Sequence, residues 1–378
     1  MNERGRHDVR AMLEQFEVPG RFVSAVPYGN GHINDTYAAD FDGEGGVCRY
    51  ILQRVNHDIF KDTLALMENV ERVTRHQKER LVAAGSHDPE RRALTLISSK
   101  DGLPYAQDSD GNTWRVYIFI DRAQTHEYVE SPRLALEAAK AFGEFQKQLV
   151  DLGGERLNET IPDFHNTPRR FEALAHAVEA DAVGRAGAAA PEIAFAMRHE
   201  PITGVLLEEH RRGRIPERIT HNDTKINNVM IDDATSEGIC VIDLDTVMPG
   251  LALYDFGDMV RTATSPSAED ETDLSKVGME MELFEALVKG YLASAGEFLT
   301  DAEQSLLAFS GKLITFEIGI RFLTDFLSGD VYFKVARENH NLDRCRTQFK
   351  LVDSIEEQEE EMNRVVERLS AGRGGRAP

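Results

Sequence analysis

A polar segment in the second half of the sequence carries the side chains that are best suited to chemistry. It contains the pattern His221-x-Asp223-x-Lys225-x-x-Asn228. An aspartate can accept the proton of a hydroxyl group, an asparagine oxygen can bind Mg²⁺, and a lysine can neutralise a phosphate. This combination suits phosphoryl transfer, to which a protein contributes mainly positioning and electrostatic stabilisation. A polar loop with solvated carboxylates is the alternative interpretation.

A second acidic segment follows the first after a turn. Residues 232–238 are rich in Asp, Ser, Thr and Gly, and the apolar runs on both sides of them are short and partly β-branched. Such a composition favours a hairpin of two strands. The hairpin would bring Asn228 and Asp243 to the same end, so we expect these two residues to bind Mg²⁺. Asp223 would then orient and deprotonate the acceptor hydroxyl, and Lys225 would lie toward the transferred phosphate.

A third acidic motif, residues 255–257, spells the Asp-Phe-Gly of the protein-kinase metal site. It follows a Pro-Gly turn and does not close the hairpin. We therefore assign the metal to Asp243 and expect Asp255 to be a buried acceptor that orients the catalytic loop. Asp245 is either a second metal ligand or an exposed neighbour.

The segment from His221 to Lys225, together with the segment from Val241 to Asp258, resembles the aminoglycoside phosphotransferase superfamily. Within it the sequence is most similar to the N-acetylhexosamine 1-kinase type, over most of the chain. The resemblance implies an α+β, two-lobed, protein-kinase-like fold with a small antiparallel β N-lobe and a large, mostly helical C-lobe. It also implies ATP and Mg²⁺ as cofactors and an amino sugar as the small-molecule acceptor, phosphorylated at its anomeric hydroxyl.

We expect the N-lobe, residues 1–120, to bind the nucleotide. A glycine-rich stretch between two apolar segments predicts a hairpin tip whose backbone N–H groups approach the phosphates, although an ordinary β-turn has the same composition. Residues 117–121 form a hinge at which the nucleotide base could bind. The candidate nucleotide-binding residues of these two segments are Gly29, Asn30, Gly31, His32, Tyr117 and Phe119.

The third strand, residues 48–56, should supply a cation for the phosphates, and it offers Gln53-Arg54 where most of the superfamily has lysine or arginine. We expect Arg54 to be this cation, although strand alternation could turn it outward and point Gln53 inward. In the next helix, residues 64–77, Glu68 or Glu71 could pair with the cation. A solvated helix face would account equally well for either glutamate.

The C-lobe, residues 121–370, should carry catalysis and acceptor binding, and residues 371–378 should form a disordered tail. Its main helices are predicted at residues 131–149, 192–212, 281–295, 302–327 and 342–370. Arg321 lies in an unusually apolar helix and needs an anionic or hydrogen-bonding partner. That partner is either the acceptor, with Tyr332 nearby, or Glu317, which lies four residues earlier.

Composition and charge narrow the class of protein. The 378 residues include 43 basic and 65 acidic side chains, and the net charge of −22 repels nucleic acid and anionic membranes. No apolar run approaches membrane-spanning length and the N-terminal residues lack a signal-peptide core, so we expect a cytoplasmic protein. Three scattered cysteines predict neither a disulfide framework nor a zinc site.

Two alternatives compete with a sugar kinase. The acceptor could be an aminoglycoside, choline or an amino-acid-like hydroxyl compound, because an acidic cleft also suits a cation. The chain could also be a catalytically silent kinase-fold binding module, although the intact Asp223, Asn228 and Asp243 argue against it.

Overall fold

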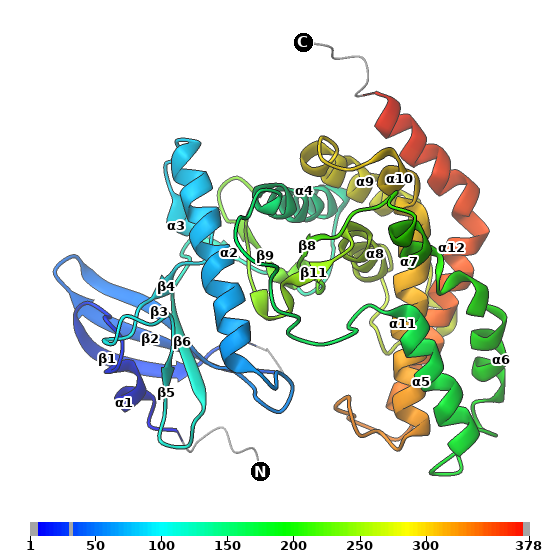
Figure 1. The fold of residues 1–378 in the computed structure, drawn as a ribbon, viewed down its shortest axis with the longest axis horizontal. Coiled ribbons are helices and arrows are strands. Elements are labelled where there is room, and N and C mark those ends of the chain that lie inside the picture. The colour runs from blue at the N-terminus through cyan, green and yellow to red at the C-terminus, as the bar shows by residue number, and fades with distance from the viewer. Residues whose placement is uncertain (1–6, 30–32, 373–378) are drawn as a thin grey trace.

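The computed structural model describes residues 7–29 and 33–372 and arranges them in two lobes (Figure 1). The smaller lobe is built on a β-sheet and the larger lobe mostly on helices, with helix α2 between the sheet and the larger lobe. Of the tail predicted at residues 371–378, all but the first two residues lie outside the described part of the chain.

The sheet of the N-lobe is antiparallel throughout. Its strands run in the order β1-β2-β3-β6-β4, and β5 pairs with the remaining part of β6. These strands are β1 (Arg21–Pro27), β2 (Asp35–Gly43), β3 (Gly46–Arg54), β4 (Leu96–Ile97), β5 (Ala106–Gln107) and β6 (Thr113–Ile118).

The two faces of this sheet have different surroundings because side chains alternate along each strand. One face, the α1-side face, carries Leu52 and Trp114, which pack with Leu13 of α1 (Val9–Leu13). The other, the core-side face, carries Ile51 and Tyr117, which are opposite each other in register and pack with the main core of the protein. Each polar residue of a strand therefore points to the α1-side face or to the core-side face according to its position in this alternation.

Helix α2 (Thr63–Ala83) follows the third strand. It begins at Asp62, whose side chain accepts a hydrogen bond from the backbone N–H of Ala65 (2.9 Å). Leu66, Val70 and Val73 form a buried stripe at helical spacing, which packs into the main core. The short helix α3 (Pro89–Arg92) lies beyond its end.

The C-lobe surrounds two small antiparallel sheets. One consists of β8 (Arg218–Thr220) and β11 (Met248–Gly250), and the other has the order β10-β9-β7, with strands β7 (Ala123–Gln124), β9 (Val229–Asp232) and β10 (Gly238–Val241). The helices are α4 (Pro132–Leu149), α5 (Thr167–Ala180), α6 (Ala190–Arg198), α7 (Val205–Arg211), α8 (Ala252–Ala263), α9 (Met281–Ala295), α10 (Asp301–Ser305), α11 (Leu307–Leu327) and α12 (His340–Ala371). Figure 1 shows α5, α11 and α12 side by side on the side of the C-lobe away from the N-lobe.

Helices α8 and α11 approach each other closely, and this contact sets the position of the site. A Cβ atom at Gly257 would lie 2.4 Å from the carbonyl oxygen of Ser310, so only glycine permits the observed spacing. Gly257 thus has a packing role in the middle of α8, which explains the glycine of the Asp-Phe-Gly letters. Among residues 7–29 and 33–372, no helix combines the length and apolar character that crossing a membrane requires.

Candidate active site

The loop that follows β8, called the catalytic loop here, is held by a buried carboxylate. Asp255, in the first turn of α8, accepts hydrogen bonds from the backbone N–H groups of His221 (2.9 Å) and Asn222 (2.7 Å). Gln146 of α4 donates a third bond to it (2.6 Å). Asn222 has a left-handed conformation (φ 65°), which asparagine tolerates better than most residues. The predicted role of Asp255 as an acceptor that shapes this loop is confirmed.

A second carboxylate of α8 holds the other side of the loop. Asp258 Oδ2 accepts a hydrogen bond from the backbone N–H of Thr224 (2.9 Å), and its Oδ1 accepts one from Arg261 Nε (2.8 Å). The Thr224 hydroxyl also donates to the backbone oxygen of Asp255 (2.6 Å). Asp223 lies between these two fixed points, so helix α8 determines where its carboxylate points.

Asp223 itself is in contact with the two neighbours that the motif predicts. Its Oδ1 is 2.9 Å from Lys225 Nζ, and its Oδ2 accepts a hydrogen bond from Asn228 Nδ2 (3.2 Å). Burial raises the pKa of Asp223, but the positive charge of Lys225 and its hydrogen bond outweigh this and hold the pKa below the ordinary value. The Asp223 carboxylate is therefore ionised at neutral pH, and 29% of its side chain remains exposed for a reactant.

The hairpin brings Asn228 and Asp243 to the same end, as predicted. The backbone N–H of Ile242 donates to the backbone oxygen of Asn228 (2.9 Å), which joins the ends of β9 and β10. Asp243 follows in a left-handed conformation (φ 59°) and is exposed. Although the residue is exposed as a whole, desolvation of its carboxylate, followed by the negative charges of Asp245 and Asp223, raises the pKa of Asp243 to about 6.

Asn228 and Asp243 fit a hard divalent cation. Asn228 uses its amide nitrogen on Asp223, and within the described residues its amide oxygen accepts no hydrogen bond. The crowding of negative charge around Asp243 is the kind of repulsion that Mg²⁺ relieves. Nowhere in residues 7–29 and 33–372 do three or more His, Cys, Asp or Glu side chains form a group able to hold a metal. An ion at this place would therefore complete its shell with water and phosphate oxygens.

The N-lobe presents Arg115, rather than Arg54, to the acidic residues. Arg54 lies on the α1-side face and pairs with Asp35 of β2 (2.6 Å). Gln53 occupies the core-side position, opposite Arg115 of β6 in register. Strand alternation thus separates Arg54 from the catalytic loop, and the structure does not bring it together with Asp223 or Asp243.

Arg115 is almost completely buried (1% exposed) and is held by residues of both lobes. Its Nε and Nη2 donate to Gln53 Oε1 (3.1 and 3.0 Å), and its Nη1 lies 2.6 Å from Asp245 Oδ1. Asp245 also accepts a hydrogen bond from Asn34 Nδ2 (2.7 Å). Asp245 is consequently a buried residue that joins the lobes, not an exposed neighbour of Asp243.

The two glutamates of α2 do not reach a strand cation. Glu68 accepts a hydrogen bond from Asn158 (3.1 Å) and lies 3.8 Å from Arg72 of its own helix. Glu71 pairs with Arg75 (3.0 Å), also on α2. Both glutamates occupy the solvated helix face that the sequence left open as an alternative.

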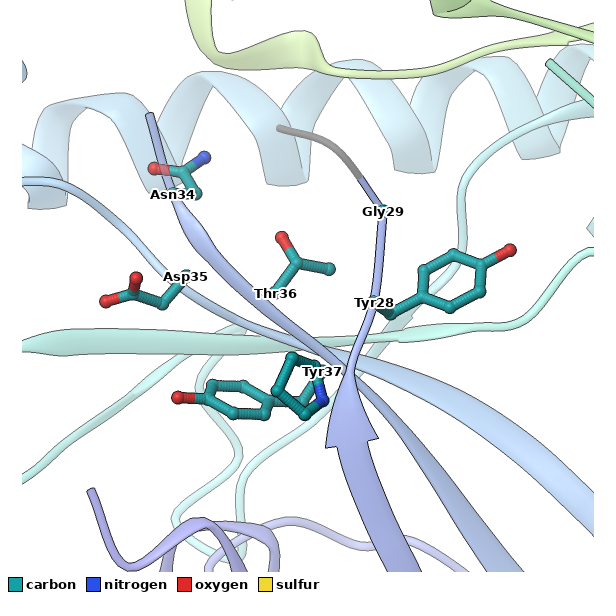
Figure 2. Close-up of a pocket in the computed structure, with 7 residues that line it drawn as sticks. Tyr28, Gly29, Asn34, Asp35, Thr36 and Tyr37 are labelled. Atoms are coloured by element: carbon teal, nitrogen blue, oxygen red, sulfur yellow. The ribbon is translucent and has the colours of Figure 1, made fainter. Parts of the chain in front are cut away.

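The end of β1 and the start of β2 line a small pocket, which contains Gly29 (Figure 2). Gly29 has φ 76°, so the chain turns here in a conformation that favours glycine. Figure 2 shows Thr36 and Tyr37 pointing to opposite sides of β2, in keeping with the strand alternation. Three of the candidate phosphate-loop residues, Asn30, Gly31 and His32, lie outside the described residues.

The two candidate hinge residues have different environments. Tyr117 is buried on the core-side face, and its ring centroid is 5.2 Å from Arg115 Cζ. Phe119 lies beyond the end of β6, where it contacts the ring of Tyr28 edge-on and the guanidinium group of Arg49. The structure therefore places Tyr117, but not Phe119, close to Asp243 and Asp245.

On the other side of the catalytic loop, a buried glutamate connects α11 to it. Glu317 accepts a hydrogen bond from Thr167 Oγ1 (2.6 Å) and is 2.8 Å from His165 Nδ1. His165 Nε2 is 3.2 Å from the backbone oxygen of Asn222. Burial raises the pKa of Glu317, but its electrostatic interaction and hydrogen bond with His165, the charge of Arg321 and the hydrogen bond from Thr167 outweigh burial and lower the pKa.

Arg321 lies one helical turn beyond Glu317 and does not pair with it. Its Cζ is 5.1 Å from the ring centroid of Phe164 and 5.8 Å from that of Phe333. Arg170 lies close by, donating Nε and Nη2 to the backbone oxygen of Phe164 (3.2 and 3.0 Å). Burial, and then the charge of Arg321, lower the pKa of Arg170.

Within the described residues, neither Arg170 nor Arg321 forms an ion pair with a carboxylate. Tyr332, which lies near Arg170, is 59% exposed. Sequence reasoning did not identify Arg115, His165 or Arg170. Only Arg115 carried a signal, because it interrupts an otherwise apolar strand in the way that Arg321 interrupts an apolar helix.

Residues 24–301 match the model of the phosphotransferase enzyme family. Among solved structures, the chain is similar to an aminoglycoside phosphotransferase from Alicyclobacillus acidocaldarius (11% identity, TM-score 0.62, 97% of each chain covered). It is also similar to a microcompartment-associated aminopropanol kinase (18% identity, TM-score 0.56, 94% of this chain and 97% of that one). A third similar structure is spectinomycin phosphotransferase in complex with ADP and spectinomycin (14% identity, TM-score 0.53, 92% and 97%). These likenesses confirm the predicted two-lobed, kinase-like α+β fold.

Proposed function

The chain belongs to the phosphotransferase enzyme family, and on that premise we propose that it is an ATP- and Mg²⁺-dependent kinase that phosphorylates the anomeric hydroxyl of an N-acetylhexosamine. Membership of the family confirms the predicted class, a small-molecule kinase, and supports the use of a nucleotide. The acceptor, the metal and the roles of individual residues are parts of the proposal.

Asp223 is the proposed base. Its carboxylate is ionised, partly exposed and fixed on both sides by α8, so it can accept the proton of an acceptor hydroxyl without rearrangement. Lys225, which contacts Asp223 (2.9 Å), would neutralise charge on the transferred phosphate. The same contact lowers the basicity of Asp223, which suits a residue that orients the hydroxyl as well as accepting its proton.

Asn228 and Asp243 are the proposed Mg²⁺ ligands. The ion would supply positive charge to the β- and γ-phosphate oxygens. Asn228 also donates to Asp223, so the same side chain links the proposed base to the metal site. This arrangement supports catalysis and argues against a silent binding module.

The observation that carries the choice of acceptor is the pair of arginines beside the catalytic loop. Arg170 and Arg321 repel each other, and within the described residues neither forms an ion pair with a carboxylate, although the charge of Glu317 acts on both. A cationic acceptor such as choline, ethanolamine or an aminoglycoside would add a further positive charge here. The hydroxyl and acetamido oxygens of an N-acetylhexosamine can instead accept hydrogen bonds from both arginines. The rings of Phe164 and Phe333 offer apolar surface to the sugar ring and the acetyl methyl group.

The test is ADP release from ATP and Mg²⁺ against matched acceptors. N-acetylglucosamine and N-acetylgalactosamine are compared with glucosamine, glucose, choline, ethanolamine and spectinomycin. We expect turnover with an N-acetylated sugar and little with the cationic compounds. Turnover confined to a cationic acceptor would overturn the sugar assignment, and tight nucleotide binding without turnover of any acceptor would favour the silent module.

A further inference from the structure

Among its described residues, the core-side face of the N-lobe lacks the usual pair of charges for holding nucleotide phosphates. Kinase folds commonly place a lysine on the third strand and pair it with a glutamate of the following helix. Here Gln53 occupies the inward position of β3. Glu68 and Glu71 bond to arginines of their own helix and, for Glu68, to Asn158. Both parts of the usual pair must therefore be replaced if this lobe binds a nucleotide.

Arg115 stands next to the position where the strand lysine would be. It faces Gln53 across the β3–β6 ladder, and its Nε and Nη2 both donate to the Gln53 side-chain oxygen. Gln53 in turn donates to Thr36 Oγ1 of β2 (3.1 Å). The line from Thr36 through Gln53 to Arg115 fixes the guanidinium group from the side of the sheet.

The other arginines of this sheet are used differently. Arg21, Arg49 and Arg54 each pair with an aspartate of β2, at N–O distances of 3.4, 2.8 and 2.6 Å. Arg115 instead pairs with a carboxylate of the opposite lobe, Asp245, two residues after the proposed metal ligand. Its charge is thus directed at the place where Mg²⁺ and the phosphates would meet.

The contact between Arg115 and Asp245 leaves hydrogen-bonding capacity unused. Nη1 and Oδ1 form an ion pair at 2.6 Å that is poorly aligned for a hydrogen bond, and in the described part of the chain neither atom has another hydrogen-bond partner. Buried guanidinium nitrogens rarely lack such a partner. A phosphate oxygen between the lobes would supply an acceptor for Nη1, and an arginine fork can bind a phosphate through two parallel hydrogen bonds.

We propose that Arg115 binds the phosphates of the nucleotide, that Gln53 positions it from β3, and that Asp245 holds it from the opposite lobe. This inference rests on the nucleotide dependence of the proposed function. It assigns the role of the strand lysine to an arginine of β6, and the role of the helix glutamate to Asp245, which follows the β9–β10 hairpin.

The experiment measures the Kd of ADP with Mg²⁺ by calorimetry, without any acceptor, in Arg115→Met and Arg54→Met. Loss of a charged hydrogen bond to phosphate should raise the Kd of Arg115→Met by about 10- to 150-fold. Arg54→Met removes an arginine of similar pairing from the opposite face, so its effect on the Kd should be much smaller. The reverse order of the two effects would overturn the assignment.

A second comparison separates the loss of Arg115 from the destabilising effect of leaving the Asp245 carboxylate buried without a counter-ion. Arg115→Met leaves Asp245 without its counter-ion, whereas Arg115→Met/Asp245→Asn removes both charges together. We expect this double variant to bind ADP much more weakly than Asp245→Asn alone, which keeps the arginine. Equal affinities in the double variant and in Asp245→Asn would overturn the role of Arg115.

The positioning role of Gln53 has its own readout. Gln53→Leu should weaken ADP binding in the wild-type background and have no further effect in the Arg115→Met background, because it acts through Arg115. Additive effects would refute positioning through Arg115. None of these measurements uses a sugar, so a failure of the proposed acceptor leaves their outcome intact. If the wild type binds ADP and Arg115→Met binds it equally well, the role of Arg115 is contradicted but the proposed function is not.

Discussion

Replacing Arg321 by alanine separates the two roles that its position in α11 allows. The guanidinium group lies between the rings of Phe164 and Phe333, and Glu317, its predicted internal partner, is engaged by His165 and Thr167. If Arg321 serves the acceptor, Arg321→Ala should raise the KM for an N-acetylhexosamine far more than the KM for ATP.

The expected magnitude follows from these contacts. A hydrogen bond from a charged donor to the sugar is worth about 1.5–3 kcal/mol, which corresponds to about 10- to 150-fold in the sugar KM. Each cation–π contact at a partly exposed site contributes only about 0.5–1 kcal/mol. Removing Arg321 also relieves its repulsion of Arg170, which offsets part of that loss. The melting temperature should therefore fall only slightly.

Steady-state kinetics with each substrate varied in turn, together with thermal melting, measure both effects. Arg185→Ala is the matched control, because Arg185 pairs with Asp330 (2.6 Å) and lies over the ring of Phe326 near the end of the same helix. This control should lower the melting temperature and leave the sugar KM close to that of the wild type. An Arg321→Ala variant that melts as early as the control and keeps a normal sugar KM would refute the acceptor role.

Three further predictions concern the catalytic loop and the acidic hairpin. Asp223→Asn should lower turnover by about 10²- to 10⁴-fold while calorimetry shows nearly normal ADP binding. A variant that keeps more than about a tenth of the wild-type turnover would show that Asp223 is not the base. Asp243→Ala should weaken Mg²⁺-dependent nucleotide binding, whereas Asp255→Ala should mainly lower the melting temperature, since it removes the acceptor of three hydrogen bonds; the opposite pattern in metal titrations would mean that the metal site was assigned to the wrong aspartate. Because the folded-state pKa of Asp243, about 6, lies above its ordinary value, the metal-free fold takes up a proton on acidification and loses stability as pH rises through 6. Asp243→Asn should therefore melt above the wild type at pH 7.5, by a smaller margin at pH 5, and close to it only below the ordinary pKa of 3.8. Mg²⁺ affinity of the wild type should fall below pH 6. Melting curves that differ equally at pH 7.5 and pH 5 would contradict this.

The β9–β10 hairpin could be predicted because its geometry is determined by residues close together in the sequence. A strand, a turn and a second strand bring Asn228 and Asp243 together whatever the rest of the chain does, and the motif fixes Asp223 and Lys225 beside them. The role of Asp255 followed from the same local geometry, since a residue outside the hairpin was free to act as an acceptor.

The phosphate cation could not be predicted with the same security. Gln53 and Arg54 are adjacent, and only the pairing of β3 with β2 and β6 decides which of them faces the core. A shift by one residue reverses both side chains, and the sequence of β3 alone does not contain the register. Arg115 lies on a strand more than fifty residues later, so its proximity to Asp245 is a consequence of tertiary structure.

One predicted helix was wrong because a proline in its sequence interrupts it. The helix expected over residues 192–212 is divided into α6 and α7, with a short 3₁₀ turn at Glu200–Ile202 between them. Pro201 lies in that turn, and proline lacks the N–H group that a continuing helix needs. Glu68 and Glu71 show a different limit, because the orientation of α2 relative to the sheet decides which of its faces meets a cation.

Phosphorus NMR of the product formed from N-acetylglucosamine, ATP and Mg²⁺ tests the central proposal most directly. If Asp223, Arg170 and Arg321 contact one acceptor, as we propose, we expect a single new phosphate resonance coupled to the anomeric proton of the sugar. A resonance coupled to the methylene protons at carbon 6, or no sugar phosphate from any N-acetylhexosamine, would contradict the assignment of a sugar 1-kinase.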